Sequence, residues 1–210
     1  MKYHLGLPPH MRHQAAVLYE EAFRQKLAPI IWNERQRIQI LETSLIPELA
    51  VVAVEGPTLA GLAGFHHSGR SFTGGCAARD VLNRLGLLKG LWAIAGLALF
   101  EQQPVADELL LDGIVVRADM RGQGIGGTLL DHLSAYAGSH GYRQLRLEVV
   151  DTNPGARRLY QRKGFVPTGT QSLPYLRRIL GFGAATTMVK ELGGRAGFAV
   201  RPHQSHWRDI

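Results

Sequence analysis

The 210-residue sequence has a single cysteine, no long apolar run and no clustered metal-ligating residues. The lone Cys76 excludes an intrachain disulfide, and without a CxxC pair we expect it to be a small buried side chain. A transmembrane helix needs about 20 consecutive apolar residues, and the sequence has none. Residues 1–13 also lack the apolar region of a secretory signal. We therefore expect a cytoplasmic protein without a metal cofactor.

The composition is that of one ordinary globular domain, with 45% hydrophobic and 20% charged residues. We expect this domain to cover residues 1–192. Residues 193–210 have no periodicity and are expected to form a loosely ordered tail. The net charge of +7 lies in the second half, because residues 117–210 hold 14 Lys and Arg against 6 Asp and Glu. No nucleic-acid-binding module accompanies these basic residues, so we expect a small polyanionic ligand and no nucleic acid.

The most informative stretch is 108–127, ELLLDGIVVRADMRGQGIGG, in which an apolar strand leads through a short turn into a glycine-rich loop and a helix. Glycines allow backbone N–H groups to turn toward an anion and allow the anion to approach closely. The helix that follows presents its N-terminus, where free amides and the helix dipole favour negative charge. This stretch predicts a binding site for a pyrophosphate.

The same loop contains a formal dinucleotide-binding fingerprint, which we reject because of its placement. Gly122, Gly124 and Gly127 fit the G-x-G-x-x-G pattern, and Glu148 stands in the approximate position of the ribose-binding acid. However, five residues separate Val116 from Gly122, whereas the fingerprint places its first glycine at the end of the strand. Glu148 is followed by two further strand residues and so lies inside its strand. A Walker lysine is absent.

The apolar periodicity predicts an alternation of strands and helices along residues 1–192. The expected order is β-α-α-β-β-(helical insertion)-β-α-β-α-β-β, and the strands 108–116 and 145–149 are expected to be parallel because a helix joins them. Asn153 and Pro154 predict the N-cap and the first residue of the last long helix.

The insertion, residues 68–104, is unusually apolar, because 85–100 contains only one charged residue, Lys89. One interpretation is a helix or helical hairpin packed on the core or on a second subunit, which would make the protein a homodimer. The other is a lid that contacts a membrane surface or a lipophilic substrate. The sequence leaves both open, but the segment is too short to span a bilayer.

Two motifs resemble those of the GCN5-related N-acetyltransferase (GNAT) family. Residues 121–126, RGQGIG, resemble the family's Q/R-x-x-G-x-G/A loop, which binds the pyrophosphate of acetyl-CoA. Residues 153–165, NPGARRLYQRKGF, resemble its N-x-x-A-x-x-L-Y-x-x-x-G-F segment at the expected distance. The resemblance covers roughly residues 1–192. It implies a mixed, twisted α/β sheet flanked by helices, acetyl-CoA as co-substrate, and direct acetyl transfer in a ternary complex to the primary amine of a small molecule or peptide.

The resemblance also implies roles for individual residues. Tyr160 would protonate the departing sulfur of CoA, although a tyrosine at this helical spacing can instead be a core aromatic. Asp112 would be the general base or, alternatively, a structural carboxylate capped by its neighbours. One of His66 and His67 could line the acceptor site. The residues that would bind the co-substrate are Ile114, Val115, Val116, Arg121, Gly122, Gln123, Gly124, Ile125, Gly126, Gly127, Thr128, Asn153, Arg157 and Tyr160.

Two further expectations concern the site as a whole. The thioester needs a gap between the two parallel strands, and we expect this gap to open at residues 151–154, just beyond the second strand. A protein with this pocket could also be an acyl-CoA sensor or scaffold without turnover, and the sequence does not exclude that alternative.

Overall fold

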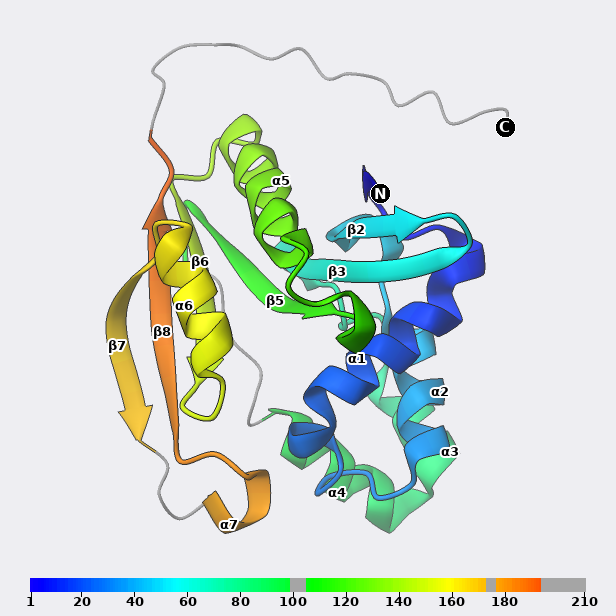
Figure 1. The fold of residues 1–210 in the computed structure, drawn as a ribbon. Coiled ribbons are helices and arrows are strands. Elements are labelled where there is room, and N and C mark those ends of the chain that lie inside the picture. The colour runs from blue at the N-terminus through cyan, green and yellow to red at the C-terminus, as the bar shows by residue number, and fades with distance from the viewer. Residues whose placement is uncertain (99–104, 173–176, 194–210) are drawn as a thin grey trace.

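A computed structural model of the chain describes residues 1–98, 105–172 and 177–193 (Figure 1). Eight strands in these residues form one mixed sheet in the order β1-β2-β3-β5-β6-β8-β7, and β4 pairs with β3 beside this path. Only β5 and β6 are parallel neighbours. The strands are β1 Lys2–Leu5, β2 Ala50–Glu55, β3 Thr58–His67, β4 Arg70–Ser71, β5 Glu108–Val116, β6 Gln144–Val150, β7 Val166–Ser172 and β8 Ala184–Glu191.

The helices follow the expected order, and two of them begin at asparagine caps. Asn33 accepts a hydrogen bond from the N–H of Gln36, and Asn153 accepts one from Ala156, as predicted from the Asn-Pro pair. The α-helices are α1 Arg12–Leu27, α2 Glu34–Ser44, α3 Ala78–Leu85, α4 Leu87–Ala98, α5 Ile125–Ser139, α6 Pro154–Arg162 and α7 Arg177–Leu180.

Helices α1 and α5 cover opposite faces of the central strands, and each comes close because a glycine lies beneath it. A Cβ on Gly61 would lie 3.3 Å from Leu129 of α5. A Cβ on Gly113 would lie 2.7 Å from the ring of Phe23 and 2.9 Å from the hydroxyl of Tyr19, both on α1. The absence of side chains at these two positions therefore sets the thickness of both layers.

A buried ion pair fixes the turn between α1 and α2. The Arg37 guanidinium donates to Oε1 of Glu20 at 2.6 and 2.8 Å and to the carbonyls of Ile31 and Trp32 at 2.7 and 2.9 Å. Both charged side chains are almost fully buried. Arg24 donates to the other Glu20 oxygen at 2.9 Å. Although burial alone would raise it, these hydrogen bonds lower the pKa of Glu20.

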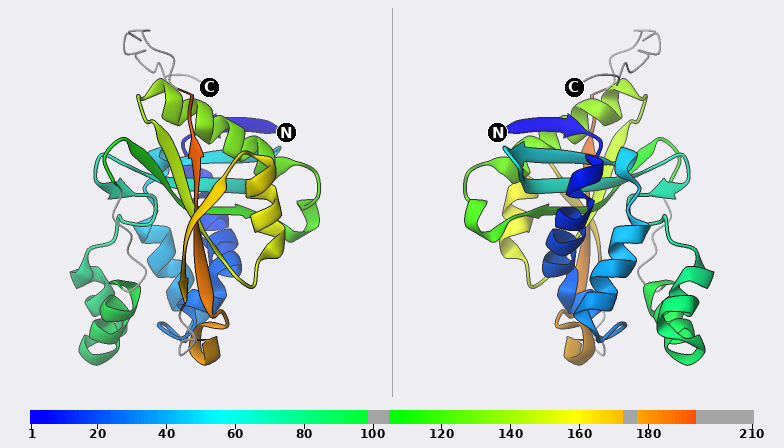
Figure 2. Two further views of the ribbon diagram at one scale, coloured as in Figure 1. Left: turned by 90° about the vertical axis from the view of Figure 1, so that its left-hand side faces the viewer. Right: turned by 90° about the vertical axis from the view of Figure 1, so that its right-hand side faces the viewer.

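The insertion forms a helical hairpin, which confirms the predicted helical character. Gly86, with φ of +77°, separates α3 from α4. Ala93 of α4 packs with Ile30, Ile31 and other apolar side chains at the α1–α2 turn. Figure 2 shows the hairpin standing beside α2, away from the strands. Residues 99–104 of the insertion lie outside the described residues.

The other face of α4 is exposed. Leu87, Leu88, Leu91 and Trp92 are between 52% and 83% exposed. They recur at helical spacing and so form one apolar stripe. Within the described parts of the chain, no helix has the length and apolar character needed to cross a membrane.

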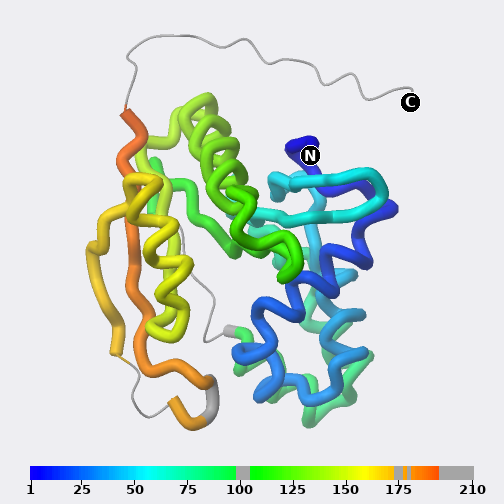
Figure 3. Tube along the Cα trace, in the orientation of Figure 1, coloured from blue at the N-terminus to red at the C-terminus, as the bar shows by residue number. Residues whose placement is uncertain are grey.

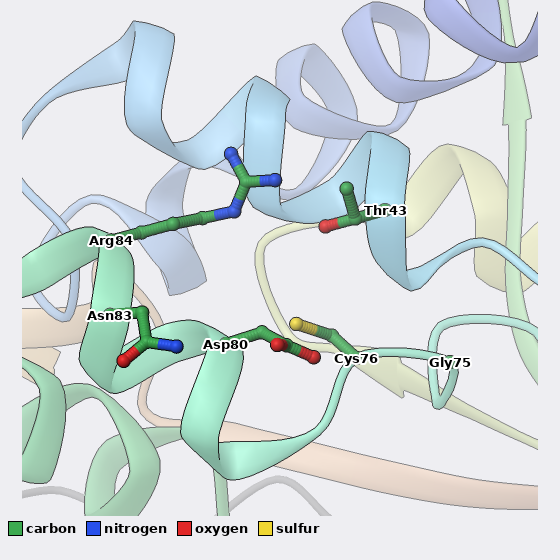
Figure 4. Close-up of a pocket in the computed structure, with 6 residues that line it drawn as sticks. All are labelled: Thr43, Gly75, Cys76, Asp80, Asn83 and Arg84. Atoms are coloured by element: carbon green, nitrogen blue, oxygen red, sulfur yellow. The ribbon is translucent and has the colours of Figure 1, made fainter.

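Cys76 is half-buried, which corrects the prediction of a buried side chain. It lies just before α3 and lines an open cavity of about 460 Å³ with Thr43, Asp80 and Arg84 (Figure 4). The prediction was wrong because the loop that carries Cys76 runs along the outside of α2, where Gly75 donates to the carbonyl of Ser44 at 2.7 Å.

Candidate active site

The parallel strands β5 and β6 separate after a short paired region. Residues 108–110 pair with residues 144–146, and no pairing between the two strands follows. Beyond that point β5 remains paired with β3, and β6 with β8. The two strands lie side by side at one end and diverge toward the other (Figures 1 and 3). The second half of β5 therefore presents main-chain N–H and C=O groups to a gap.

A β-bulge at Asp112 accounts for the separation. Gly64 pairs with Gly113 and Phe65 pairs with Leu111, so Asp112 is an extra residue on β5. A bulge bends its strand and increases the twist. The prediction that the gap opens at residues 151–154 was wrong, because alternation of apolar residues does not reveal a bulge within the strand.

The glycine loop lies at the end of β5 and leads into the N-terminus of α5. Gly122 and Gly124 have φ of +82° and +81°, in the left-handed region that only glycine adopts readily. Gly124 is the N-cap of α5, and no side chain caps the helix. Among the described residues, none accepts a hydrogen bond from the N–H groups of 124–127. These donors and the helix dipole suit an anion.

The other two glycines of the loop allow close packing behind it. A Cβ on Gly126 would lie 3.3 Å from Leu159, and one on Gly127 would lie 2.9 Å from the Lys163 side chain, both on α6 or at its end. Lys163 also pairs with Asp131 at 2.5 Å, which ties α6 to α5. The start of α5 is thus held directly against α6.

The predicted co-substrate residues lie on three segments: the second half of β5, the loop with the first turn of α5, and α6. Nε of Arg121 donates to the carbonyl of Val116 at 3.1 Å, which joins the loop to the end of β5. Ile125 and Val115 are buried, so they can contribute only main-chain groups there. Gln123 and Thr128 lie in the loop and the first turn of α5. Asn153 and Arg157 are exposed at the start of α6, whereas Tyr160 is buried near its end.

Tyr160 lies on α6 and is only 5% exposed. Its ring packs against Phe165 with centroids 5.9 Å apart. Among the described residues, none hydrogen-bonds to its hydroxyl. Burial raises the pKa of Tyr160 well above that of an exposed tyrosine. The ring is therefore packed in the core, and the hydroxyl stays protonated at neutral pH.

Asp112 belongs to a polar cluster on the opposite face of β5, beneath α1. Its Oδ2 accepts hydrogen bonds from the Thr73 N–H at 3.0 Å and the Thr73 hydroxyl at 2.9 Å. Its Oδ1 faces Nε2 of His66 at 3.9 Å. Burial and then the neighbouring Asp112 raise the pKa of Tyr19 well above its usual value. Sequence reasoning missed Thr73 and Tyr19, since neither belongs to a local motif.

Lys26 extends the same region toward the end of α1. Its ammonium lies 5.6 Å from the centroid of the Phe182 ring. Burial lowers the pKa of Lys26, and the carboxylates of Glu148 and Asp112 oppose that effect. This side of the sheet thus contains charges of both signs from α1, β5 and β6.

The two adjacent histidines of β3 lie on opposite faces of the sheet. His67 hydrogen-bonds to the Tyr142 hydroxyl at 2.8 Å and contacts the ring of His140. Burial and then His140 lower the pKa of His67. Only His66 reaches the Asp112 cluster. Within the described residues, no group of three or more His, Cys, Asp or Glu could hold a metal ion.

Comparison with known proteins agrees with this architecture. The model of the family described as "Acetyltransferase (GNAT) family" matches residues 18–165. Streptothricin acetyltransferase from Streptomyces lavendulae is 34% identical over 82 residues, a match that spans 39% of this chain and only 43% of that relative.

Solved structures show the same fold. An N-acetyltransferase from Staphylococcus aureus Mu50 superposes with a TM-score of 0.62 at 15% identity, covering 90% of this chain and all of the other. The ribosomal-protein-S18-alanine N-acetyltransferase from Escherichia coli gives a TM-score of 0.55 at 20% identity, covering 95% and 98%. At these identities the likeness concerns the fold alone. Together with the family match, the separated strands and the glycine loop, it establishes that the chain belongs to the GNAT acetyltransferase family.

Proposed function

We propose that the protein transfers the acetyl group of acetyl-CoA to a primary amine by direct attack within a ternary complex. The observation that carries this proposal is the gap between β5 and β6, which leads from the Asp112 cluster to the uncapped N-terminus of α5. A pyrophosphate at the loop and a thioester arm beside β5 would occupy one continuous path along the sheet.

The glycine loop fits a bound pyrophosphate. Its N–H groups at 124–127 would hold the phosphate oxygens together with Arg121. The main chain of residues 114–116 would align the pantetheine arm as an added strand does. Asn153 and Arg157 are exposed at the start of α6 and would contact the rest of the co-substrate. Acetyl-CoA would supply the reactive acetyl thioester.

Two protein groups would manage the protons of the reaction. Tyr160 would donate its hydroxyl proton to the sulfur as charge develops there, and its raised pKa keeps that proton in place at neutral pH. The cluster around Asp112 would serve the opposite step, in which the amine loses a proton. A covalent acetyl-enzyme is not required, because Cys76 lies in the cavity outside α2 rather than in the gap.

The amine itself is a separate question. The match to streptothricin acetyltransferase makes streptothricin the first acceptor to test. Because less than half of that relative is matched, the test should include other amines, namely spermidine, L-lysine and a peptide with a free N-terminal alanine.

The experiment measures release of the CoA thiol from acetyl-CoA with each amine, and mass spectrometry then identifies the acetylated product. We expect amine-dependent thiol release with at least one of the four. Tight binding of acetyl-CoA without release for any amine would favour the alternative, an acyl-CoA sensor or scaffold. Failure to bind acetyl-CoA would refute both.

A further inference from the structure

We propose that His66, positioned by Asp112, accepts the proton that the acceptor ammonium loses before it attacks the thioester. This inference rests on the proposed acetyl transfer and assigns one of its steps to a residue outside the family motifs. It makes Asp112 a positioning residue that acts through the imidazole.

His66 lies where the gap begins. On β3 it follows Phe65, which pairs with Leu111 just before the bulge. Gly64, on the same face of β3 as His66, is covered by Phe72, and Phe65 on the other face contacts Tyr136 of α5. The His66 and Asp112 side chains are 14% and 15% exposed. Both side chains are thus largely shielded from bulk water, and each keeps some exposed surface.

Asp112 is poorly suited to accept the proton itself. Its Oδ2 already receives two hydrogen bonds from Thr73, and the buried Tyr19 hydroxyl also interacts with this carboxylate. Both Asp112 oxygens are thus already engaged by protein groups, Oδ2 by Thr73 and Oδ1 by the facing imidazole. The Oδ1 that faces His66 can orient the imidazole and stabilise its cationic form. Histidine is the side chain that changes charge near neutral pH.

The other ionisable groups around this pair have identifiable roles. Glu108 of β5 pairs with Arg146 of β6 at 2.7 Å. Tyr19 of α1 stays protonated because burial raises its pKa, so it cannot accept a proton. Arg70 of β4 is exposed and pairs in register with His67 rather than His66. Lys26 of α1, near Glu148 and Asp112, is the remaining rival because burial lowers its pKa.

The proposed step balances its protons. The ammonium gives one proton to Nδ1 of neutral His66, whose Nε2–H faces Asp112. The resulting imidazolium is stabilised by Asp112 and later releases the proton to solvent. The amine nitrogen then forms the bond to the acetyl carbon, the carbon–sulfur bond breaks, and sulfur takes the proton of Tyr160. The second proton lost by nitrogen replaces the one that Tyr160 donated.

The test compares His66→Gln with His67→Gln, because the two histidines are neighbours on one strand and face opposite sides of the sheet. The measurement is kcat/KM against pH with the fastest amine of the four, together with acetyl-CoA affinity. His66→Gln should lower kcat/KM by about 10²- to 10⁴-fold and remove the limb in which activity rises through neutral pH. His67→Gln should stay within about threefold on the same scale. Acetyl-CoA affinity should be unchanged in both.

Asp112→Asn provides the second readout and keeps the proposal testable if His66→Gln does not fold. The amide can still accept from Thr73, but the imidazolium loses its counter-charge, so the rising limb should move to lower pH.

A limb that persists unmoved in Asp112→Asn, or activity within about threefold in His66→Gln, overturns the assignment. Loss of the limb in Lys26→Met alone would transfer the role to Lys26. In those cases wild-type acetyl transfer remains intact, whereas absence of amine-dependent thiol release in the wild type refutes the proposed function itself.

Discussion

The two sides of the gap are built in different ways. The proposed donor side, where acetyl-CoA would bind, consists mainly of main-chain groups from one continuous stretch, 114–128, with glycines that shape the loop. The acceptor side consists of side chains from four separate elements, among them Tyr19, His66, Thr73 and Asp112. The first construction requires particular residue types at fixed spacing and therefore leaves a motif. The second requires only that distant residues meet, so it leaves none.

The largest effect should come from a charge in the donor loop. Gly124→Asp places a carboxylate beside the proposed phosphate site, at a position whose left-handed backbone disfavours other residues. Gly124→Asn is the matched control, because asparagine is nearly isosteric, neutral and more tolerant of this conformation. We expect Gly124→Asp to weaken acetyl-CoA binding by more than about 100-fold, a cost of about 3 kcal/mol, and Gly124→Asn to weaken it much less. Equal affinities in a calorimetric titration would contradict the loop assignment.

Removal of the Tyr160 hydroxyl tests the donor side at the chemical step. Tyr160→Phe should lower kcat by about 10²- to 10⁴-fold with little change in the KM for acetyl-CoA, because the proton is needed only as charge develops on sulfur. The ring that packs on Phe165 is retained. Because burial raises the pKa of Tyr160, its ionisation should not appear in the accessible pH–rate profile. A loss of less than about threefold would leave Tyr160 as a core aromatic only.

Sequence reasoning predicted the donor side because each of its parts is local. The order of strands and helices was confirmed, as were the N-cap at Asn153 and the parallel pair on either side of α5. Periodicity and glycine chemistry report such features directly. The bulge at Asp112 was missed, because a single extra residue between two apolar neighbours looks like ordinary alternation. The position of the gap was wrong for the same reason.

The acceptor side could not be predicted from the sequence to the same depth. Thr73 and Asp112 are 39 residues apart, and their hydrogen bonds depend on how the segment after β4 folds back over β5. The sequence left open whether His66 or His67 lines the site, since the choice depends on which face of β3 is covered by α1. Both outcomes depend on long-range packing, which short-range patterns do not encode.

The Glu20–Arg37 ion pair joins α1, the helix that carries Tyr19 and Lys26, to α2. Arg37→Met would leave Glu20 buried with only Arg24 as partner, which should lower the free energy of unfolding by about 3–5 kcal/mol. Arg24→Met is the control, because this arginine is 49% exposed and its pair is screened by water, so the loss of stability should be much smaller. Denaturant titration measures both. Similar losses in the two variants would argue against a dominant role for Arg37.

The two faces of α4, which packs at the same α1–α2 turn, allow a test with a smaller expected effect. Leu97 packs in the cluster at the α1–α2 turn, whereas Leu91 is 52% exposed. Leu97→Glu should cost about 1–3 kcal/mol, and Leu91→Glu should stay within about 0.5 kcal/mol in a monomer. A large loss of thermal stability in Leu91→Glu, or a change in molar mass by light scattering, would mean that a second subunit covers this stripe. Loss of vesicle binding without either change would favour the membrane-surface interpretation.

The smallest expected effect links both sides through their buried tyrosines. Burial raises the pKa of Tyr19 on the acceptor side and of Tyr160 on the donor side. In the unfolded chain each would ionise near pH 10, while in the folded protein each stays protonated. The stability they contribute is therefore complete below about pH 10 and is lost as the pH rises toward the folded-state values. At pH 10.5 each tyrosine should lower the free energy of unfolding by about 0.8 kcal/mol relative to pH 8.

Tyr160→Phe should remove the Tyr160 share of this loss without altering the share of Tyr19. The reason is that the two residues contact opposite faces of the sheet and have no common partner in the described structure. A denaturant titration at both pH values measures the difference. An alkaline loss of the same size in the wild type and in Tyr160→Phe would show that this hydroxyl is less shielded from water than its burial indicates, and would weaken its assignment as a proton donor that is never ionised at neutral pH.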